Sequence, residues 1–112
     1  GLARRTTILR DWLQFLENYP LVLMPVSWQL PFTSDHDQRG DAALGQLVRA
    51  HEPMTAVSLL GLPGLAVPTG TSDGVPVGVQ LVANRFQEDL CMLAGEVIEA
   101  ACSMRTPIDP KQ

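Results

Sequence analysis

Three consecutive residues, Asp35, His36 and Asp37, place two carboxylates around an imidazole, and these groups can bind divalent metal ions. A metal site needs further ligands from another part of the chain, and no second cluster with ligand spacing supports this one. His51 and Glu52 form an isolated pair, and a histidine at a helix end more often interacts with the last carbonyl groups of the helix. We therefore predict no metal site and interpret the tripeptide as part of a solvated polar loop.

Nucleophilic catalysis by a serine would require a base held beside it. The serines of this chain are isolated from one another and none lies in a nucleophile-elbow turn: Ser27, Ser34, Ser58, Ser72 and Ser103. Lys111, the single lysine, is next to last and follows two prolines. A lysine base must be desolvated and within hydrogen-bond reach of its serine, so we assign no catalytic residue.

The glycine-containing segment 70–74 could expose backbone N–H groups to a phosphate. It leads into an expected strand, however, and lacks the Gly-Lys-Ser/Thr ending of a nucleotide-binding loop. A hairpin turn explains it better, and we assign no cofactor-binding residue. Trp28 and Phe32, in a long loop, are the residues we consider for the wall of a substrate pocket, although aromatic residues in loops more often pack onto their own domain.

Cys91 and Cys102 fall in one expected helix, where eleven residues place them about 16 Å apart along the axis. A disulfide needs Cα atoms within about 7 Å, so we predict reduced thiols that are buried and inert.

The composition fits one domain with a modest core. The chain has 112 residues, of which 46% are hydrophobic and 18% charged, and a missing partner surface would explain this apolar balance. The charged residues that give the net charge of −4 are scattered along the chain, which argues against nucleic acid as a partner. The pair Arg4 and Arg5 is expected to be a solvated helix end. Without a bilayer-length apolar run or a signal peptide, we expect no membrane partner and a cytoplasmic location. The start Gly-Leu-Ala, without methionine, fits a piece of something longer.

The first half of the chain predicts two helices around a short strand and a loop. Leu9, Trp12, Leu13 and Leu16 share one face of a helix over residues 7–17, with Ile8 and Phe15 widening the stripe. Residues 21–24 are continuously apolar and suit a strand covered on both faces. Residues 28–39 read as a loop, and long loops often border functional sites. Asp41 is expected to cap a helix that ends before Pro53.

The second half predicts a hairpin followed by a helix. A short helical turn over residues 55–60 should end at Gly61 in left-handed geometry. Residues 65–67 and 77–82 are expected strands around a turn at 69–74, with Val77, Val79 and Leu81 on one face. A last helix from Asn84 should be capped by that residue together with Gln87. Its apolar positions are Phe86, Leu90, Leu93, Ala94, Val97 and Ala101.

The ordered motifs Gly61-Leu-Pro63, Val67-Pro68, Gly70 and Gly74-Val-Pro-Val-Gly-Val-Gln-Leu-Val82, followed by Phe86 and Glu88, closely resemble the C-terminal end of amidase-signature enzymes. The segment Tyr19-Pro-Leu-Val-Leu-Met-Pro25 is similar to the buried strand of that family, ending at a proline. Two departures are Ser58, where the family usually has asparagine, and Gln87, where aspartate commonly caps the last helix. The glycines and prolines here have architectural roles, because they permit positive φ, close backbone approach and strand ends.

The resemblance implies an α/β fold with a small mixed sheet flanked by helices. It implies a parent enzyme that hydrolyses a small-molecule carboxamide through an acyl-serine, without metal or organic cofactor, or that transfers ammonia to misacylated tRNA. The family's Gly-Gly-Ser-Ser-Gly-Gly loop is absent here, which implies that the Ser/Ser/Lys apparatus lies upstream.

We therefore expect residues 1–106 to form a C-terminal structural segment of an amidase-type domain and residues 107–112 a flexible tail. The expected partner is the remainder of the parent amidase core, and apolar edges left exposed should promote self-association. The alternative is a stand-alone, non-catalytic α/β interaction module. Uncovered edges at residues 21–24 and 65–67 favour the segment, whereas covered edges favour the module.

Overall fold

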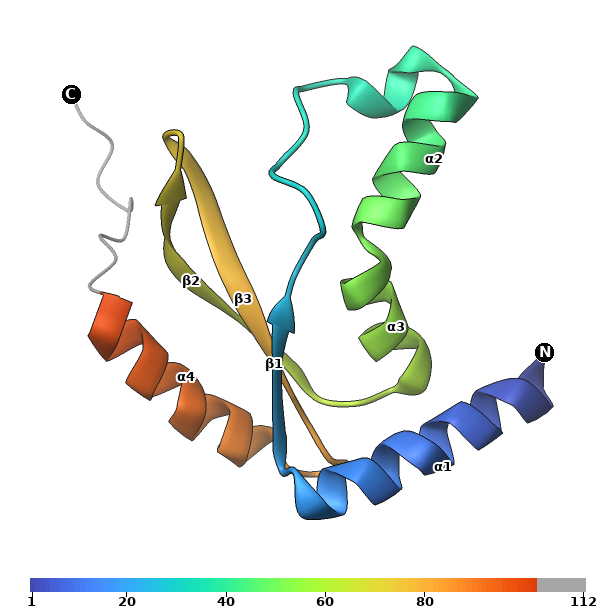
Figure 1. The fold of residues 1–112 in the computed structure, drawn as a ribbon, viewed down its shortest axis with the longest axis vertical. Coiled ribbons are helices and arrows are strands. Elements are labelled where there is room, and N and C mark those ends of the chain that lie inside the picture. The colour runs from blue at the N-terminus through green and yellow to red at the C-terminus, as the bar shows by residue number, and fades with distance from the viewer. Residues whose placement is uncertain (103–112) are drawn as a thin grey trace.

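The structure is a computed structural model that describes residues 1–102, with helices on both faces of a small sheet (Figure 1). The α/β class expected from the sequence is therefore confirmed. No helix in this part of the chain is both long and apolar enough to span a bilayer. The predicted boundary at 106, the predicted tail 107–112 and Lys111 lie outside the described residues. The elements, in chain order, are α1 (Leu2–Asn18), β1 (Leu21–Pro25), the 3₁₀ helix η1 (His36–Arg39), α2 (Asp41–Ala50), α3 (Glu52–Leu60), β2 (Gly64–Ser72), β3 (Val75–Ala83) and α4 (Glu88–Cys102).

The sheet has the strand order β1-β3-β2. Both pairings within residues 1–102 are antiparallel, so the sheet described here is antiparallel where we expected a mixed one. β2 and β3 form the predicted hairpin, which turns at Asp73 and Gly74 with φ of 51° and 78°. Two left-handed residues in succession make the kind of tight turn for which Asp-Gly is favoured, so the turn is shorter than the predicted segment 69–74.

One face of the sheet packs against α1 and α3. Val82, which is fully buried, lies in β3 at the centre of this layer, and Val22 and Met24 of β1 pack against it. The predicted face of Leu9, Trp12, Leu13 and Leu16 is confirmed, because Leu9 and Leu16 are buried here and Trp12 and Leu13 pack against the cluster. The predicted widening of this stripe is wrong, since Ile8 and Phe15 are exposed. The buried members are Leu9, Leu16, Val57, Leu60, Leu62 and Val82.

The other face of the sheet packs against α4. Val79 and Leu81 of β3 point to this side, as the alternation of strand residues predicts. The cluster also contains Val67, Ala83, Cys91, Leu65, Ala94 and Ile98. Gly95 of α4 permits the close approach, because a Cβ there would lie 2.6 Å from the Leu65 Cδ2 atom of β2.

α4 begins later than predicted and presents a different side to the sheet. It starts at Glu88, and Asn84 instead forms a turn in which its carbonyl oxygen accepts a hydrogen bond from the Gln87 N–H at 3.1 Å. The capping box is therefore wrong, as is the helical position of Phe86, which is 88% exposed with φ of 63°. The buried residues of α4 are Cys91 and Gly95. The predicted stripe residues Leu93 and Val97 are 61% and 70% exposed.

The start of each of the first three α-helices also differs from the prediction. α1 begins at Leu2 rather than residue 7, and α3 begins at Glu52 because Pro53 is tolerated in a first helical turn. The N-cap of α2 is Gly40, so Asp41 is the first helical residue and not the cap. Gly61 ends α3 in left-handed geometry with φ of 66°, as predicted.

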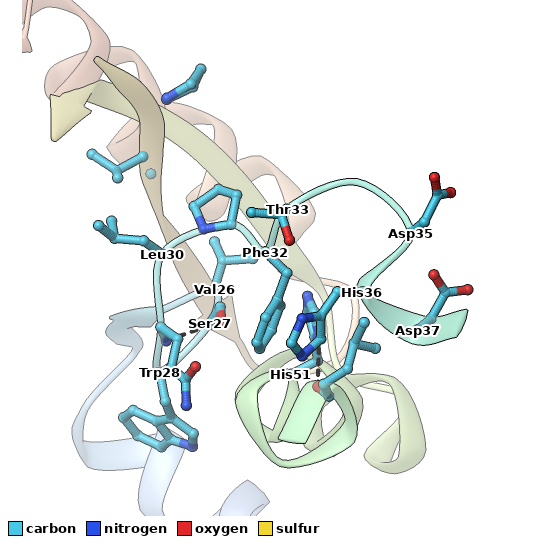
Figure 2. Close-up of a pocket in the computed structure, with 16 residues that line it drawn as sticks. Val26, Ser27, Trp28, Leu30, Phe32, Thr33, Asp35, His36, Asp37 and His51 are labelled. Carbon is cyan, nitrogen blue, oxygen red and sulfur yellow. Dashed lines mark hydrogen bonds between the residues drawn. The ribbon is translucent and has the colours of Figure 1, made fainter. Parts of the chain in front are cut away.

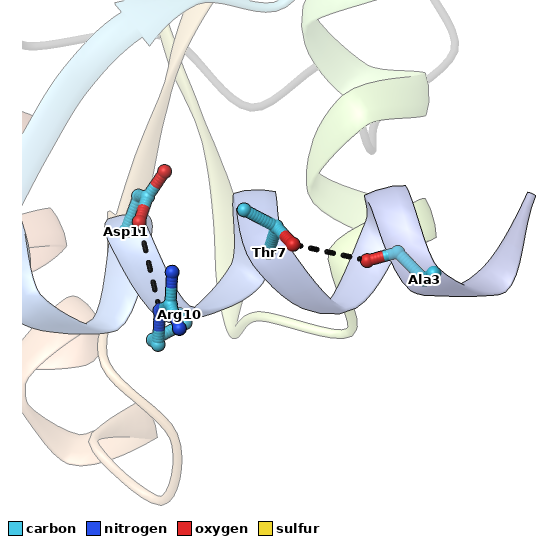
Figure 3. Close-up of polar contacts among 4 residues, drawn as sticks. All are labelled: Ala3, Thr7, Arg10 and Asp11. Atoms are coloured by element: carbon cyan, nitrogen blue, oxygen red, sulfur yellow. Dashed lines mark hydrogen bonds and ion pairs between the residues drawn. The ribbon is translucent and has the colours of Figure 1, made fainter.

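The outer side of α1 is polar and makes local contacts. Thr7 donates from Oγ1 to the Ala3 carbonyl oxygen at 3.1 Å, and Arg10 lies 3.9 Å from Asp11 in an exposed ion pair (Figure 3). Such an exposed pair contributes little stability. Arg5 is more than the solvated helix end we expected, because its Nε donates to the Leu59 carbonyl oxygen at the end of α3. A cation is favourable at a helix C-terminus, so Arg5 helps to join α1 to α3.

β1 lies at one edge of the sheet and is covered only in part on its α4 side, where Leu21 packs against the second cluster. Val22 and Met24 face the α1 and α3 layer, whereas Leu23, on the other face, is 60% exposed. The expectation of a strand covered on both faces is thus not met by the described residues. β2 lies at the other edge, where Val67 is buried beneath α4.

Candidate functional site

The loop that follows β1 forms one wall of a cavity of about 710 Å³. Trp28 and Phe32, the two residues expected at a pocket wall, both line it (Figure 2). The opposite walls come from the end of α2 at His51 and from the first half of β3 at Val77 and Gly78. The site is therefore assembled from the loop, the end of α2 and a strand, β3, that is distant from both in sequence.

Backbone hydrogen bonding and sheet pairing hold these segments in place. The Trp28 N–H donates to the Ala50 carbonyl oxygen at 2.9 Å, which fixes the loop to the end of α2. Gln80 is a buried polar residue of β3, and its Nε2 donates to the Pro25 carbonyl oxygen at 3.2 Å. This contact joins the centre of the sheet to the residue after which the loop begins.

Three aromatic rings lie together in the cavity. The Phe32 and His36 rings are stacked, with centroids 4.5 Å apart and planes inclined by 27°. The His51 ring is tilted by 42° relative to Phe32, with a centroid separation of 6.4 Å. Stacked and tilted arrangements are favourable for aromatic groups, so Phe32 has a defined orientation between α2 and the loop. Trp28 lies at the rim and is 61% exposed.

The two imidazoles differ in their hydrogen bonds. His51 Nδ1 lies 2.8 Å from the Leu47 carbonyl oxygen, which confirms that this histidine interacts with a last carbonyl of its helix. A carbonyl can only accept, so Nδ1 carries the proton and Nε2 of the neutral ring is an acceptor. His36 Nε2 lies 3.3 Å from Gln46 Oε1, in α2.

The carboxylates beside His36 do not join it in a cluster. Asp35 and Asp37 are exposed, and Figure 2 shows both side chains pointing away from the imidazole ring. Asp35 adopts left-handed backbone geometry with φ of 60°, and its Oδ1 accepts a hydrogen bond from Gln38 Nε2 at 3.4 Å. Within residues 1–102 no group of three or more acidic, histidine or cysteine side chains is placed to hold a metal ion.

The serines are dispersed over the fold. Ser27 lines the cavity, where its Oγ accepts a hydrogen bond from the Gln29 N–H at 3.2 Å. Ser58 donates to the Met54 carbonyl oxygen inside α3, and Ser34 and Ser72 are exposed. Ser103 lies outside the described residues.

The cysteines are free thiols in α4, as predicted. Cys91 is buried, and its Sγ lies 3.8 Å from the Leu81 carbonyl oxygen. Burial raises the pKa of the Cys91 thiol above its ordinary value, and the negative charge of Glu88 adds to the increase. This thiol is consequently held in its neutral, unreactive form.

Sequence reasoning found the aromatic wall but missed the part played by His36 and His51. From the sequence alone, His36 could be interpreted only as a possible metal ligand and His51 only as a helix-end contact. No periodic pattern predicts that the loop lies over the end of α2. The spacing of fifteen residues between the two histidines carries no signal of the stacked arrangement with Phe32.

Comparison with known proteins identifies related sequences and a related fold. The chain is 38% identical over 98 residues to an indoleacetamide hydrolase of Bradyrhizobium japonicum, covering 87% of this chain and 21% of that protein. It is 33% identical over 96 residues to a glutamyl-tRNA(Gln) amidotransferase subunit of Streptococcus gordonii, covering 86% and 19%. The crystal structure of the corresponding subunit from Thermotoga maritima matches with a TM-score of 0.53 and 26% identity, over 78% of this chain and 18% of that one.

The chain thus spans about a fifth of the length of the relatives it matches. The sequence profile of the Amidase family matches residues 1–92, which is most of the chain. That match includes the motifs from Gly61 to Glu88, whose glycines and prolines lie at the end of α3 and in the β2–β3 hairpin. The chain belongs to the amidase family.

Proposed function

We propose that this chain is a C-terminal structural segment of a larger amidase that cleaves carboxamide C–N bonds, and that the catalytic serines and lysine lie in the remainder of the parent. The observation that carries the proposal is the coverage of about a fifth of each relative by a chain that is matched over most of its own length. The serines described here are dispersed, and none has a lysine beside it within residues 1–102, because the single lysine is Lys111.

Apolar side chains left uncovered on this chain support the proposal that it packs against the remainder of a larger core. Leu23 on β1 and Leu93 and Val97 on α4 are each more than half exposed, although aliphatic side chains of this size are among those most often buried. A helix that is apolar on two sides is usually covered on both. Packing against the remainder of the parent core would cover these residues, and without it they favour self-association.

Exposure of the outer strands β1 and β2 was expected to distinguish a segment of a larger core from an independent module, and the two strands give opposite answers. At β1 the exposed Leu23 favours a segment, whereas at β2 the buried Val67 is covered by this chain's own α4. The stand-alone module therefore remains the second candidate, favoured by the two clusters that this chain forms by itself.

The cavity beside Phe32 is proposed as part of the substrate pocket of the parent. Its wall is built by Trp28 and Phe32, and exposed aromatic surface in a cavity suits a small-molecule substrate with an apolar part. Relatives named as an indoleacetamide hydrolase and as part of a tRNA amidotransferase support both amide hydrolysis and ammonia transfer. The apolar character of this wall favours hydrolysis of a substrate with an aromatic part.

The proposal is tested by assaying two preparations for release of ammonia from a simple aromatic carboxamide. The purified 112-residue chain is expected to be inactive, and a longer chain that includes the upstream segment is expected to be active. Hydrolysis by the 112-residue chain, lost when one of its own serines is changed to alanine, would contradict the proposal. Inactivity of both preparations toward a panel of carboxamides would favour the interaction module.

A further inference from the structure

We propose that the cavity beside Phe32 binds a flat aromatic ring that carries an N–H group, and that His51 Nε2 accepts a hydrogen bond from that group. The inference rests on the proposed function, since it names the chemical class of the substrate part that this wall would contact. It concerns two properties of the cavity, an available acceptor and an uncovered aromatic surface.

The acceptor follows from the hydrogen bonds of His51. Its Nδ1 is 2.8 Å from the Leu47 carbonyl oxygen and must donate the proton, which leaves a lone pair on Nε2 of the neutral ring. Among residues 1–102 no hydrogen bond is formed by this Nε2 atom, and no buried polar side-chain atom in the same range lacks a partner. The unpartnered Nε2 is therefore exposed to solvent, and His51 is one of the residues that line the cavity.

His36 provides an internal comparison. Its Nε2 is 3.3 Å from Gln46 Oε1, and one face of its ring lies on Phe32. This imidazole already has a polar partner and a stacking partner within the chain. Gln46 Oε1 can only accept, so His36 Nε2 carries the proton and its Nδ1 is an acceptor as well. His51 is the imidazole that is not stacked on Phe32, so we assign the acceptor to its Nε2, and the His36→Phe variant tests that choice.

The remaining lining favours a neutral, flat group. Trp28 is 61% exposed and Leu30 is 45% exposed at the same cavity, so a bound ring would cover apolar surface that this chain leaves open. Aromatic rings associate favourably in stacked or edge-to-face arrangements. The lining carboxylates Asp35 and Asp37 point away from the rings (Figure 2), so no charge beside the rings selects a cation.

The test compares two probes that differ at one N–H group, indole and 1-methylindole. The ¹⁵N-labelled 112-residue chain is titrated with each, and the backbone amide shifts of Trp28, Phe32 and His51 are followed by NMR. We expect saturable shifts for both probes, with indole binding about fivefold more tightly, the factor expected from one hydrogen bond.

Two matched variants locate the acceptor. His51→Phe keeps an aromatic ring but removes Nε2, and it should bind indole and 1-methylindole equally. His36→Phe keeps a ring stacked on Phe32 and should retain the fivefold preference. Each variant is first compared with the unchanged chain by its amide spectrum, which shows whether the fold is kept.

Equal binding of the two probes by the unchanged chain would overturn the inference, whatever the variants do. Absence of saturable shifts would overturn it as well, and so would a preference for indole that survives in His51→Phe. The titration measures binding without turnover. If indole is not bound selectively but the longer chain hydrolyses amides, only this inference is rejected. Selective indole binding in a protein that hydrolyses no amide rejects only the proposed function.

Discussion

Gly78 is the residue at which the sheet leaves no room for a side chain. A Cβ there would lie 2.7 Å from the Val67 carbonyl oxygen and 3.3 Å from the carbonyl carbon, both backbone atoms of the neighbouring strand β2. Glycine in a strand interior often marks close approach of another backbone, and the sequence predicted that role here. The contact cannot be relieved by rotating a side chain, so a substitution would have to move one strand relative to the other.

Gly78→Ala is therefore expected to lower the free energy of unfolding by about 1–3 kcal/mol, the usual cost of overpacking. The matched control is Gly45→Ala in α2, where a Cβ would meet only Arg49 atoms at 3.9 Å. That control should raise the stability by about 0.5–1 kcal/mol, because alanine is the better helix former. Urea unfolding followed by circular dichroism measures both, and equal effects of the two substitutions would contradict the packing argument.

Cys91 makes stability depend on pH in the alkaline range. Burial raises the pKa of its thiol above the ordinary value of 9.0, so the folded chain holds this proton more tightly than the unfolded chain. As pH rises through about 9, the unfolded state loses its proton first, and the free energy of unfolding falls. Below that pH the contribution is fully present.

We expect the unchanged chain to lose stability between about pH 8 and pH 10 more steeply than Cys91→Ala, which keeps Cys102 and every other titrating group. Urea unfolding at a series of pH values measures the difference. Parallel stability profiles for the two chains would show that the thiol is not protected by burial.

At the scale of elements, α4 shows what the periodic pattern can and cannot predict. The sequence placed an apolar helix here with Ala94 toward the sheet, which the structure confirms. It also chose Leu93 and Val97 for that face, where the structure uses Cys91, Gly95 and Ile98. Both sides are apolar, so periodicity alone could not choose between them. The choice is made by the close approach of Gly95 to Leu65, a contact between distant parts of the chain.

The double substitution of Leu93 and Val97 by serine should leave the stability of the 112-residue chain within about 0.5 kcal/mol, as expected for exposed positions. It should also lower self-association, measured by sedimentation. Ile98→Ser is the control on the covered side, with an expected loss of about 1–3 kcal/mol. A loss of stability for the double variant as large as for the control would show that the exposed side of α4 is already packed.

The strands and the loop were predicted with different success. The β2–β3 hairpin and the short strand β1 follow from apolar runs between glycines and prolines, which are local signals. The cavity could be predicted only as a loop with two aromatic residues. The contact of Phe32 with His36 and His51 depends on how the loop lies over the end of α2, and no local pattern encodes that.

At the scale of the whole molecule, two small hydrophobic clusters lie on opposite faces of one sheet. Three strands with helices on both faces can form a stable unit, but Leu23 on β1 and the Leu93 and Val97 side of α4 are left uncovered. The ordered motifs in residues 61–88 resemble the amidase family, and the family match over residues 1–92 confirms that resemblance.

We propose that this chain completes an amidase core whose catalytic residues are encoded upstream. Sequencing the reading frame upstream of the Gly1 codon tests it most directly. We predict an open frame that encodes a lysine-bearing strand followed by the Gly-Gly-Ser-Ser-Gly-Gly loop. A start codon immediately upstream of Gly1 would contradict the claim and identify the chain as a small independent module.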